Sequence, residues 1–278
     1  MKLFLRLLVL IVCALWRHQA LAQQLCNFGG RAAGMGNASV THTDVWALGN
    51  NTAGLTGVQQ PQLGLYVENR FGESAFTTVA LQAAYPTKRH GTYGLSLSRF
   101  GDALFSQQHV GVGAAHKLGQ FSVGAKADVW QVAVAGYGNQ KAVTLSAGVQ
   151  GEVVPNVYFG AFAYNLNQAQ LATFEDERLP TVMKAGLAYR PTTRLLLAAE
   201  TEKDIDHRAD VKAGAEYAVL EGKFVLRTGF STRTNRLSAG AGFQARQLQI
   251  DYAFGVAVPL GNSHHLALSY RLPTPRPD

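Results

Sequence analysis

The sequence lacks several features that would place it in a common class of soluble or helical membrane protein. Its 278 residues include only two cysteines, Cys13 and Cys26, which excludes a disulfide-based scaffold. Charged residues make up only 15% and form no Lys/Arg blocks, which argues against nucleic acid as a partner. After residue 22 no apolar run approaches the length of a transmembrane helix. Passage through a membrane would therefore require a closed barrel of strands, because hydrocarbon offers no partner to an open sheet edge.

Residues 1–22 are expected to form a secretory signal peptide. Lys2 and Arg6 precede an apolar run over residues 7–16, and Ala-Leu-Ala ends at Ala22, which is a suitable cleavage site. Cleavage would leave 22 basic and 18 acidic residues, so the formal charge would fall from +7 to +4. Cys13 would leave with the signal, and Cys26 is then expected to be a single buried thiol.

A period of two dominates the rest of the chain. In LQIDYAFGV, residues 248–256, apolar side chains alternate with polar or small ones, as in a strand with one apolar face. The same pattern recurs behind the expected signal and predicts strands at residues 62–69, 76–85, 92–98, 109–117, 121–130, 142–151, 157–164, 182–189, 194–201, 210–219, 224–230, 237–245, 248–256 and 265–271. About fourteen strands is an even number, as bacterial outer-membrane barrels have.

The connections between these strands alternate between tight and longer. Tight turns are expected at 118–120 and 191–193, and longer loops at 100–108, 133–141 and 165–181. Short periplasmic turns and long external loops produce this alternation in an outer-membrane barrel. The prediction is an all-β, transmembrane, antiparallel up-and-down barrel over residues 61–272, with residues 23–60 inserted in the lumen and 273–278 as a tail. A soluble all-β sandwich is the alternative. The barrel predicts the outer membrane of a Gram-negative bacterium, with both chain ends on the periplasmic side.

Two end motifs carry a family resemblance. Residues 29–58, GGRAAGMGNASVTHTDVWALGNNTAGLTGV, resemble the N-terminal signature of FadL-like proteins in the PorV/PorQ group of Bacteroidetes, and residues 251–270 are similar to the closing hairpin of that group. Thr43-Asp44 stands in place of an acidic pair, and Thr52 in place of a proline. The resemblance implies a fourteen-stranded barrel with its N-terminal segment in the lumen. It also implies relatives that are fatty-acid channels or outer-membrane components of type IX secretion.

The inserted segment is where ligand binding or gating is expected. Glycines let backbone approach the barrel wall closely, and loops often carry function. The equal alternative is a fixed structural plug. Residues 37–46 are expected to supply a short helical turn. The candidate residues of the segment are Arg31, Gly34, Gly36, Asp44, Asn51, Thr52 and Ala53.

Charged residues on the predicted inward faces form a second set of candidates. They either line a water path or pair with one another and with the inserted segment, and pairing is favoured because both signs occur in similar numbers. Arg31 is the expected partner of Glu200 and Glu202, which share one strand face. The full set is Glu68, Lys126, Asp128, Lys184, Arg190, Glu200, Glu202, Lys212, Glu216, Arg227, Arg246 and Asp251.

No catalytic, metal or cofactor site is expected. Ser263 and His264 are adjacent on a strand and therefore point to opposite faces, so they cannot form a nucleophile–base pair. The remaining histidines show no metal-ligand spacing and are expected to be interfacial or solvated: His42, His90, His109, His116 and His207.

Two functions follow from this pattern. The first is a non-enzymatic component of type IX protein secretion or a related surface assembly, with protein partners. The alternative is a passive transporter of a hydrophobic small molecule such as a long-chain fatty acid, with an apolar pocket at residues 51–55 and a gap in the wall. Both readings imply contact with outer-membrane lipid and neither involves nucleic acid.

Overall fold

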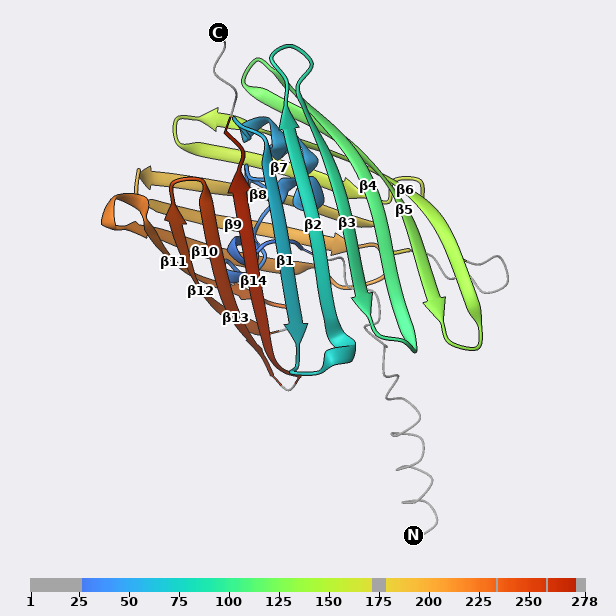
Figure 1. Cartoon of the computed structure of the whole chain (residues 1–278). Helices are drawn as coiled ribbons and strands as arrows, with labels where there is room; N and C mark the ends of the chain where they lie inside the picture. The colour runs from blue at the N-terminus through green and yellow to red at the C-terminus, as the bar shows by residue number, and fades with distance from the viewer. Residues whose placement is uncertain (1–26, 172–178, 234, 259, 274–278) are drawn as a thin grey trace, which may run out of the picture.

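Fourteen antiparallel strands close into a barrel, each hydrogen-bonded to the strands before and after it in sequence, and β1 pairs with β14 (Figure 1). The structure is a computed structural model, and it describes residues 27–171, 179–233, 235–258 and 260–273. The expected signal peptide, Cys26 and the tail after residue 273 lie outside the described residues. The prediction of a fourteen-stranded up-and-down barrel is confirmed.

The strands follow one another without crossovers. They are β1 (Gln62–Arg70), β2 (Thr77–Pro86), β3 (Thr92–Gly101), β4 (Phe105–Leu118), β5 (Phe121–Val134), β6 (Gly138–Val154), β7 (Val157–Tyr164), β8 (Val182–Thr192), β9 (Leu195–Asp204), β10 (Asp210–Val219), β11 (Phe224–Ser231), β12 (Arg236–Ala245), β13 (Leu248–Ala257) and β14 (Gly261–Arg271). Short 3₁₀ turns, η2 (Ser74–Phe76) and η3 (Leu220–Gly222), lie in two of the connections.

Several strands are longer than the alternation predicts. β4, β5, β6 and β14 extend furthest past the expected ends, and the β3–β4, β5–β6 and β13–β14 connections shrink to residues 102–104, 135–137 and 258–260. The extensions contain glycine, glutamine and asparagine on both faces, so they lack apolar alternation although their backbones still pair. The predicted contrast between tight turns and long loops is therefore wrong for these three connections, including the longer loop expected at residues 257–264.

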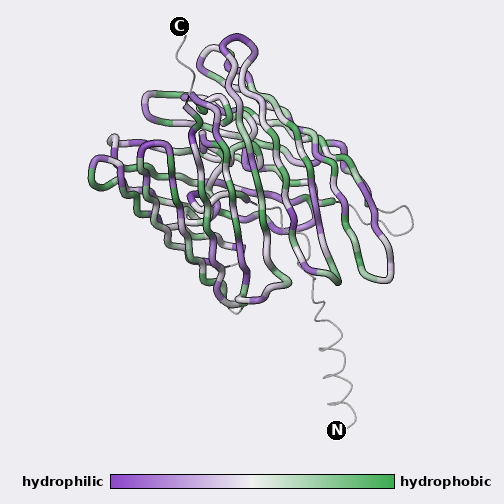
Figure 2. The backbone as a smooth tube through the Cα atoms, viewed as in Figure 1, coloured by the Kyte–Doolittle hydropathy of each residue, from purple (hydrophilic) through white to green (hydrophobic). Residues whose placement is uncertain are grey.

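The two faces of the wall differ in chemistry. Outward side chains between the barrel ends are mostly apolar and exposed, for example Leu65, Leu81, Leu97 and Val112. Figure 2 shows the resulting alternation of hydrophobic and hydrophilic residues along the strands. An apolar outer band suits lipid, and the inward faces are polar or small, as in transmembrane barrels. Among the described residues, no helix has the length and apolar character needed to cross a membrane.

The barrel has two distinct ends. At the end that we call the turn end, β2–β3, β4–β5, β6–β7, β8–β9, β10–β11 and β12–β13 are joined, and β1 begins beside the last residue of β14. The opposite end, called the loop end, carries the other connections, including the one over residues 165–181. The C-terminal end of the barrel lies at the turn end (Figure 1).

Residues 27–61, called the plug, lie inside the barrel. The plug contains α2 (Gly30–Gly34), α3 (Ala47–Asn50) and the 3₁₀ helix η1 (Thr52–Gly57). The helical turn predicted for residues 37–46 is wrong, because the helices form on either side of that stretch. There, glycine and asparagine residues bend the chain: Gly36 and Asn37 both have positive φ, 66° and 64°.

The apolar core of the molecule lies between the plug and the wall. Met35, Val45, Leu48 and Leu55 of the plug are fully buried. Many of their neighbours on the strands are alanines, such as Ala80, Ala84, Ala115 and Ala267. Burying a side chain of this size contributes about 1.5–3 kcal/mol, so the plug is held by a substantial apolar contact.

A ring of inward glycines makes room for the plug. At ten strands a glycine faces a plug residue so closely that a side chain would collide with it. At Gly124 a Cβ atom would lie 2.5 Å from the backbone nitrogen of Ala53, and at Gly229 it would lie 2.1 Å from that of Gly36. The ring comprises Gly64, Gly94, Gly113, Gly124, Gly148, Gly160, Gly186, Gly214, Gly229 and Gly240.

Candidate functional site

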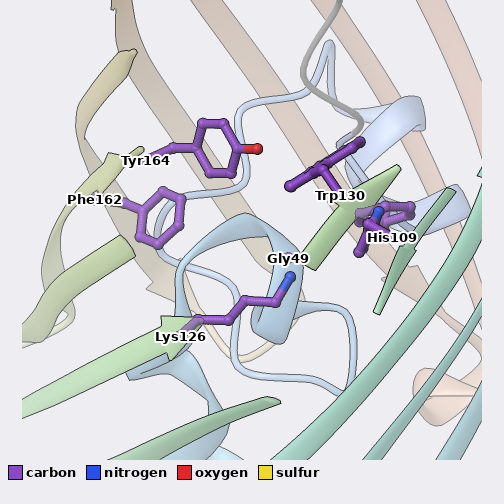
Figure 3. A pocket seen from close by; sticks show the side chains of 7 residues that line it. Gly49, His109, Lys126, Trp130, Phe162 and Tyr164 are labelled. Carbon is purple, nitrogen blue, oxygen red and sulfur yellow. The ribbon is translucent and has the colours of Figure 1, made fainter. Parts of the chain in front are cut away.

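A cavity lined mainly by aromatic side chains lies in the lumen. Its walls come from the plug (Phe28 and Gly49), from β4 and β5, and from β7: the lining side chains beyond the plug are His109, Lys126, Trp130, Phe162 and Tyr164. In Figure 3 the side chain of Lys126 extends into the space between Phe162 and His109. The cavity measures about 20 Å³, room for about one water molecule, so a larger ligand enters only if the plug or the lining side chains move. Mostly apolar walls with a few placed polar groups are typical of sites for small hydrophobic ligands.

The polar groups of this cavity are held in fixed positions. Lys126 Nζ lies 2.8 Å from Asp128 Oδ1. The ring of His109 lies against Trp130, with centroids 4.5 Å apart, and its two nitrogens contact Ser96 Oγ at 3.1 Å and Ser98 Oγ at 2.6 Å. Trp130 Nε1 is buried and has no hydrogen-bond partner among the described residues. The ammonium of Lys126 is therefore already paired with Asp128, and the N–H of Trp130 is enclosed by the surrounding side chains.

The cavity is not at the position that the channel hypothesis predicts. It touches Phe28 and Gly49 of the plug rather than residues 51–55, which pack tightly against β5 and β6 instead. Beside it β6 extends beyond β7, and residues 138–146 of β6 have no strand partner on that side among the described residues. Asn167 covers part of this edge by accepting from Leu145 N at 2.8 Å and donating to Val143 O at 2.8 Å.

An ion-pair chain ties the plug to β10, β11 and β13. Arg31 donates from Nε to Glu216 Oε2 and from Nη2 to Glu216 Oε1, both at 2.8 Å, and Nη1 lies 3.5 Å from Asp44 Oδ2. Glu216 also accepts from Arg227 at 2.7 Å, and Arg227 donates to Asp251 at 2.7 Å. The predicted partnership of Arg31 with Glu200 and Glu202 is therefore wrong, because α2 lies beside β11–β13 rather than β9.

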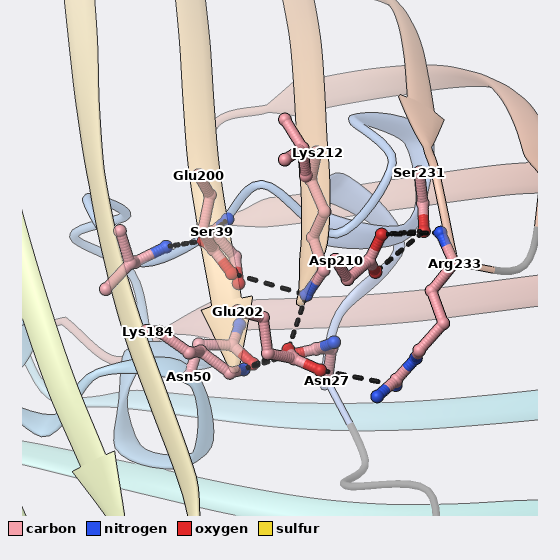
Figure 4. A network of polar contacts seen from close by, with 12 residues as sticks. Asn27, Ser39, Asn50, Lys184, Glu200, Glu202, Asp210, Lys212, Ser231 and Arg233 are labelled. Carbon is pink, nitrogen blue, oxygen red and sulfur yellow. Dashed lines mark hydrogen bonds and ion pairs between the residues drawn. The ribbon is translucent and has the colours of Figure 1, made fainter. Parts of the chain in front are cut away.

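Glu200 and Glu202 anchor a second part of the plug. Glu200 Oε2 accepts from the backbone N–H groups of Ser39 and Val40 at 2.7 and 2.8 Å (Figure 4). Lys212 bridges the two carboxylates at 3.3 and 2.5 Å. Glu202 also pairs with Lys184 at 3.6 Å, and Lys184 donates to the side chain of Asn27.

The remaining inward candidates fall into two groups. Glu68 pairs with Arg70 at 2.7 Å, so each of the ten charges predicted deep in the lumen has a partner of opposite sign. Arg190 and Arg246 are exposed instead, the first at the end of β8 and the second in the β12–β13 turn. The strand alternation was extended too far at these two positions.

The other plug candidates lie where the backbone meets the wall. Gly34 contacts Gly240, and Gly36 N donates to Ser238 Oγ at 3.0 Å. Asn51 donates to Val40 O at 2.7 Å and to Val149 O at 3.2 Å, and its Oδ1 accepts from Ala53 N. Thr52 is buried and donates to Leu48 O at 3.4 Å. These residues fasten the plug and do not line the cavity.

Several lumen residues were missed or misjudged from the sequence. His42 and His109 are buried rather than solvated. Buried His265 contacts Tyr66 OH at 2.8 Å and also Arg236, and Asp210 accepts from Ser231 at 2.8 Å. The predicted strand 210–219 already contains Asp210, and its period of two puts Asp210 on the inward face with Lys212. Extending the predicted strand 237–245 by one residue would have placed Arg236 inside. Ser263 is buried and His264 exposed, so they face opposite sides as expected.

The electrostatic environment of the plug favours one charge state. Burial lowers the pKa of Arg31, but Glu216 and Asp44 outweigh it and raise that pKa above its usual value. Burial, with Arg31 and Arg227 nearby, lowers the pKa of His42 well below its usual 6.5. The docked plug therefore carries a charged Arg31 and a neutral His42 at neutral pH.

Comparisons with known proteins identify the fold only. No family model matches the chain, and no curated protein is similar in sequence. Among solved structures, the Ralstonia pickettii toluene transporter TbuX is 15% identical, with a TM-score of 0.69 over 90% of this chain and 100% of that one. The Pseudomonas putida toluene transporter TodX is 12% identical, with a TM-score of 0.70 and the same coverage.

A third similar structure is a FadL homologue from Pseudomonas aeruginosa. It is 13% identical, with a TM-score of 0.64 over 90% of this chain and 99% of that one. The chain thus has the fold of FadL-like outer-membrane barrels. Nothing in these comparisons supports the narrower resemblance to the PorV/PorQ group.

Proposed function

We propose that the protein is a non-enzymatic channel for a hydrophobic small molecule in the outer membrane of a Gram-negative bacterium. The observation that carries this proposal is the aromatic cavity of Phe28, Trp130, Phe162 and Tyr164 inside a closed barrel. Similar structures described as toluene transporters agree with a channel and lend no support to type IX secretion.

The cavity chemistry suggests what enters. Stacked rings such as His109 and Trp130 suit a flat or chain-like apolar molecule. Lys126 and the unused Trp130 N–H would additionally hold an oxygen acceptor, such as a carboxylate, at one end of that molecule. A monoaromatic hydrocarbon and a long-chain fatty acid therefore differ in whether they use these two donors.

The plug would act as the hatch between the cavity and the turn end. Met35, Val45, Leu48 and Leu55 are fully buried against the wall and block a straight path through the lumen. Passage then requires the plug to shift, which means breaking the Arg31–Glu216 pair or the contacts of Glu200. This gives the gating candidates Arg31 and Asp44 a mechanical role.

Ligand binding can be tested through Trp130 fluorescence in detergent. Titration with toluene and with a long-chain fatty acid should change the emission, and Trp130→Phe should abolish the response while Trp46 still emits. If the ammonium of Lys126 holds the carboxylate, Lys126→Met should weaken binding of the fatty acid and leave binding of toluene unchanged. No response to either ligand, in a barrel that remains folded on a gel, would contradict the proposal.

A further inference from the structure

Exposed basic residues gather at the turn end of the barrel. They lie in the turns, within three residues of them, or at the last residue of β14, and we call them the basic rim: Lys88, Arg89, Lys117, Arg190, Arg194, Lys223, Arg246 and Arg271. Seven are exposed and Arg271 is half-buried. Only two carboxylates, Glu152 and Glu221, occupy the described residues in and beside the same turns.

The excess of basic over acidic residues at the turn end is larger than the excess in the whole chain after residue 22. After residue 22 the sequence has 22 basic and 18 acidic residues. Of these, 20 basic and 14 acidic residues are described by the structure, and removing the eight basic and two acidic residues of the turn end leaves 12 of each elsewhere. The net positive charge of the protein therefore comes from one end of the barrel.

An aromatic belt adjoins the basic rim on the outer surface. Its members are exposed and lie in the last or first residues of strands at the turn end: Tyr85, Tyr93, Tyr189, Tyr217, Phe224, Phe243 and Tyr270. Phe224 and Phe243 contact each other, with centroids 4.9 Å apart. Belts of this kind mark the boundary between the hydrocarbon and the headgroups. The rim cations adjoin this belt in sequence, as Lys223 adjoins Phe224, so they stand at the level of lipid phosphates. Arg190 differs, because its guanidinium lies over the ring of Tyr158 on the inner side of the wall.

We propose that the basic rim binds anionic phospholipid headgroups and so selects lipids with net negative charge around the turn end. A Lys or Arg side chain at this depth extends toward the phosphate while its stem stays against the apolar belt. Attraction to anionic headgroups is strong near the surface and falls off within a Debye length. A zwitterionic headgroup carries its own cation, so it gains less from the same ring of side chains.

The inference rests on the membrane placement of the barrel and not on which molecule it transports. Failure of ligand binding would leave it intact, and loss of lipid selectivity would leave the channel proposal intact. The loop end lacks this bias. Within three residues of its connections, the described part of the chain has eight basic residues and seven acidic ones: Arg70, Arg99, Lys184, Lys203, Arg208, Lys212, Arg233 and Arg236 against Glu68, Glu73, Asp102, Glu202, Asp204, Asp206 and Asp210. The exposed cations at or near this end are Arg99, Lys141, Lys203 and Arg208. Those four cations provide a matched control set.

The test is electron spin resonance of spin-labelled phosphatidylglycerol and phosphatidylcholine in vesicles of phosphatidylcholine that contain the full barrel. Both leaflets have the same composition, so the orientation of the protein does not matter. Beside a rim cation, phosphatidylglycerol should be preferred over phosphatidylcholine about fivefold. Averaged with the loop end, where no preference is expected, the measured preference for phosphatidylglycerol should be about threefold. High salt should reduce it.

Two fourfold variants decide the interpretation. Lys88→Ser, Arg89→Ser, Lys117→Ser and Lys223→Ser together remove half of the rim cations and should lower the preference to about twofold. The control combination Arg99→Ser, Lys141→Ser, Lys203→Ser and Arg208→Ser should leave most of it. Equal loss in both sets, or no preference in the unaltered protein, would overturn the proposal. The second result would point to an acidic soluble partner instead.

Discussion

Arg31 of the plug and Glu216 of β10 meet in a two-point ion pair, with Nε and Nη2 each 2.8 Å from a carboxylate oxygen. The two residues are 185 positions apart in sequence, and the pair joins the plug to β10. Arg31 is also the only basic residue between positions 23 and 61. Trypsin can therefore cut the plug only there, and the docked pair protects that site.

Glu216→Gln should loosen the plug. The substitution leaves Arg31 and Arg227 without their shared carboxylate, and breaking a buried pair on one side costs about 3 kcal/mol. If trypsin cuts only molecules in which the plug has come away from the wall, cleavage at Arg31 should then be about 100-fold faster. Glu221→Gln, at an exposed carboxylate of the β10–β11 connection, is the matched control. A cleavage rate equal to that of the control would exclude the ion pair as a latch.

Gly124→Val should also displace the plug, for a steric reason. A Cβ atom there would lie 2.5 Å from the backbone nitrogen of Ala53, and neither backbone can yield without moving η1. Hydrogen exchange over residues 45–58 should increase, while exchange of the strand backbones stays low. Ala125→Val places the same side chain on the outer face of β5 and should leave the plug protected. Unchanged exchange in Gly124→Val would refute the close fit.

Acid should weaken plug docking through His42. The pKa of His42 is lowered in the docked plug, so the released plug binds the proton more readily. Docking is therefore strongest above the ordinary value of about 6.5 and weakens as the pH falls below it. Tryptic cleavage at Arg31, corrected for the pH dependence of trypsin on a free peptide, should rise from pH 7.5 to pH 5.5. His42→Gln should remove much of this rise, and an identical rise in the variant would assign it to other groups.

The strands were predictable from sequence because alternation is a local signal. β7 and β10 match their predicted bounds, and β1 differs by one residue. Alternation fails where a strand leaves the membrane, as at Phe105 and Gly138, since neither face there must be apolar. The alternation did not indicate which inward aromatic residues would line the cavity or which inward glycines would contact the plug.

The site was harder to predict than the wall because it depends on contacts distant in sequence. Glu200 and Glu216 both face the lumen on neighbouring strands, and alternation alone cannot tell which of them Arg31 reaches. The path of the plug decides this, and glycines such as Gly160 and Gly214 set that path. His109 was misjudged because a single histidine near a strand end is often solvated, whereas here β4 is long and places it deep in the lumen.

The central claim is that a hydrophobic molecule passes through the aromatic cavity, and uptake measures it most directly. Gram-negative cells without channels of their own would produce either the unaltered protein or a variant, and accumulate radiolabelled toluene or fatty acid. Phe162→Trp fills the cavity, whereas Phe159→Trp makes the same change on the outer face of β7. The account predicts uptake by the unaltered protein and by Phe159→Trp, and its loss in Phe162→Trp. Equal uptake by all three proteins, or no uptake above cells without the barrel, would contradict it.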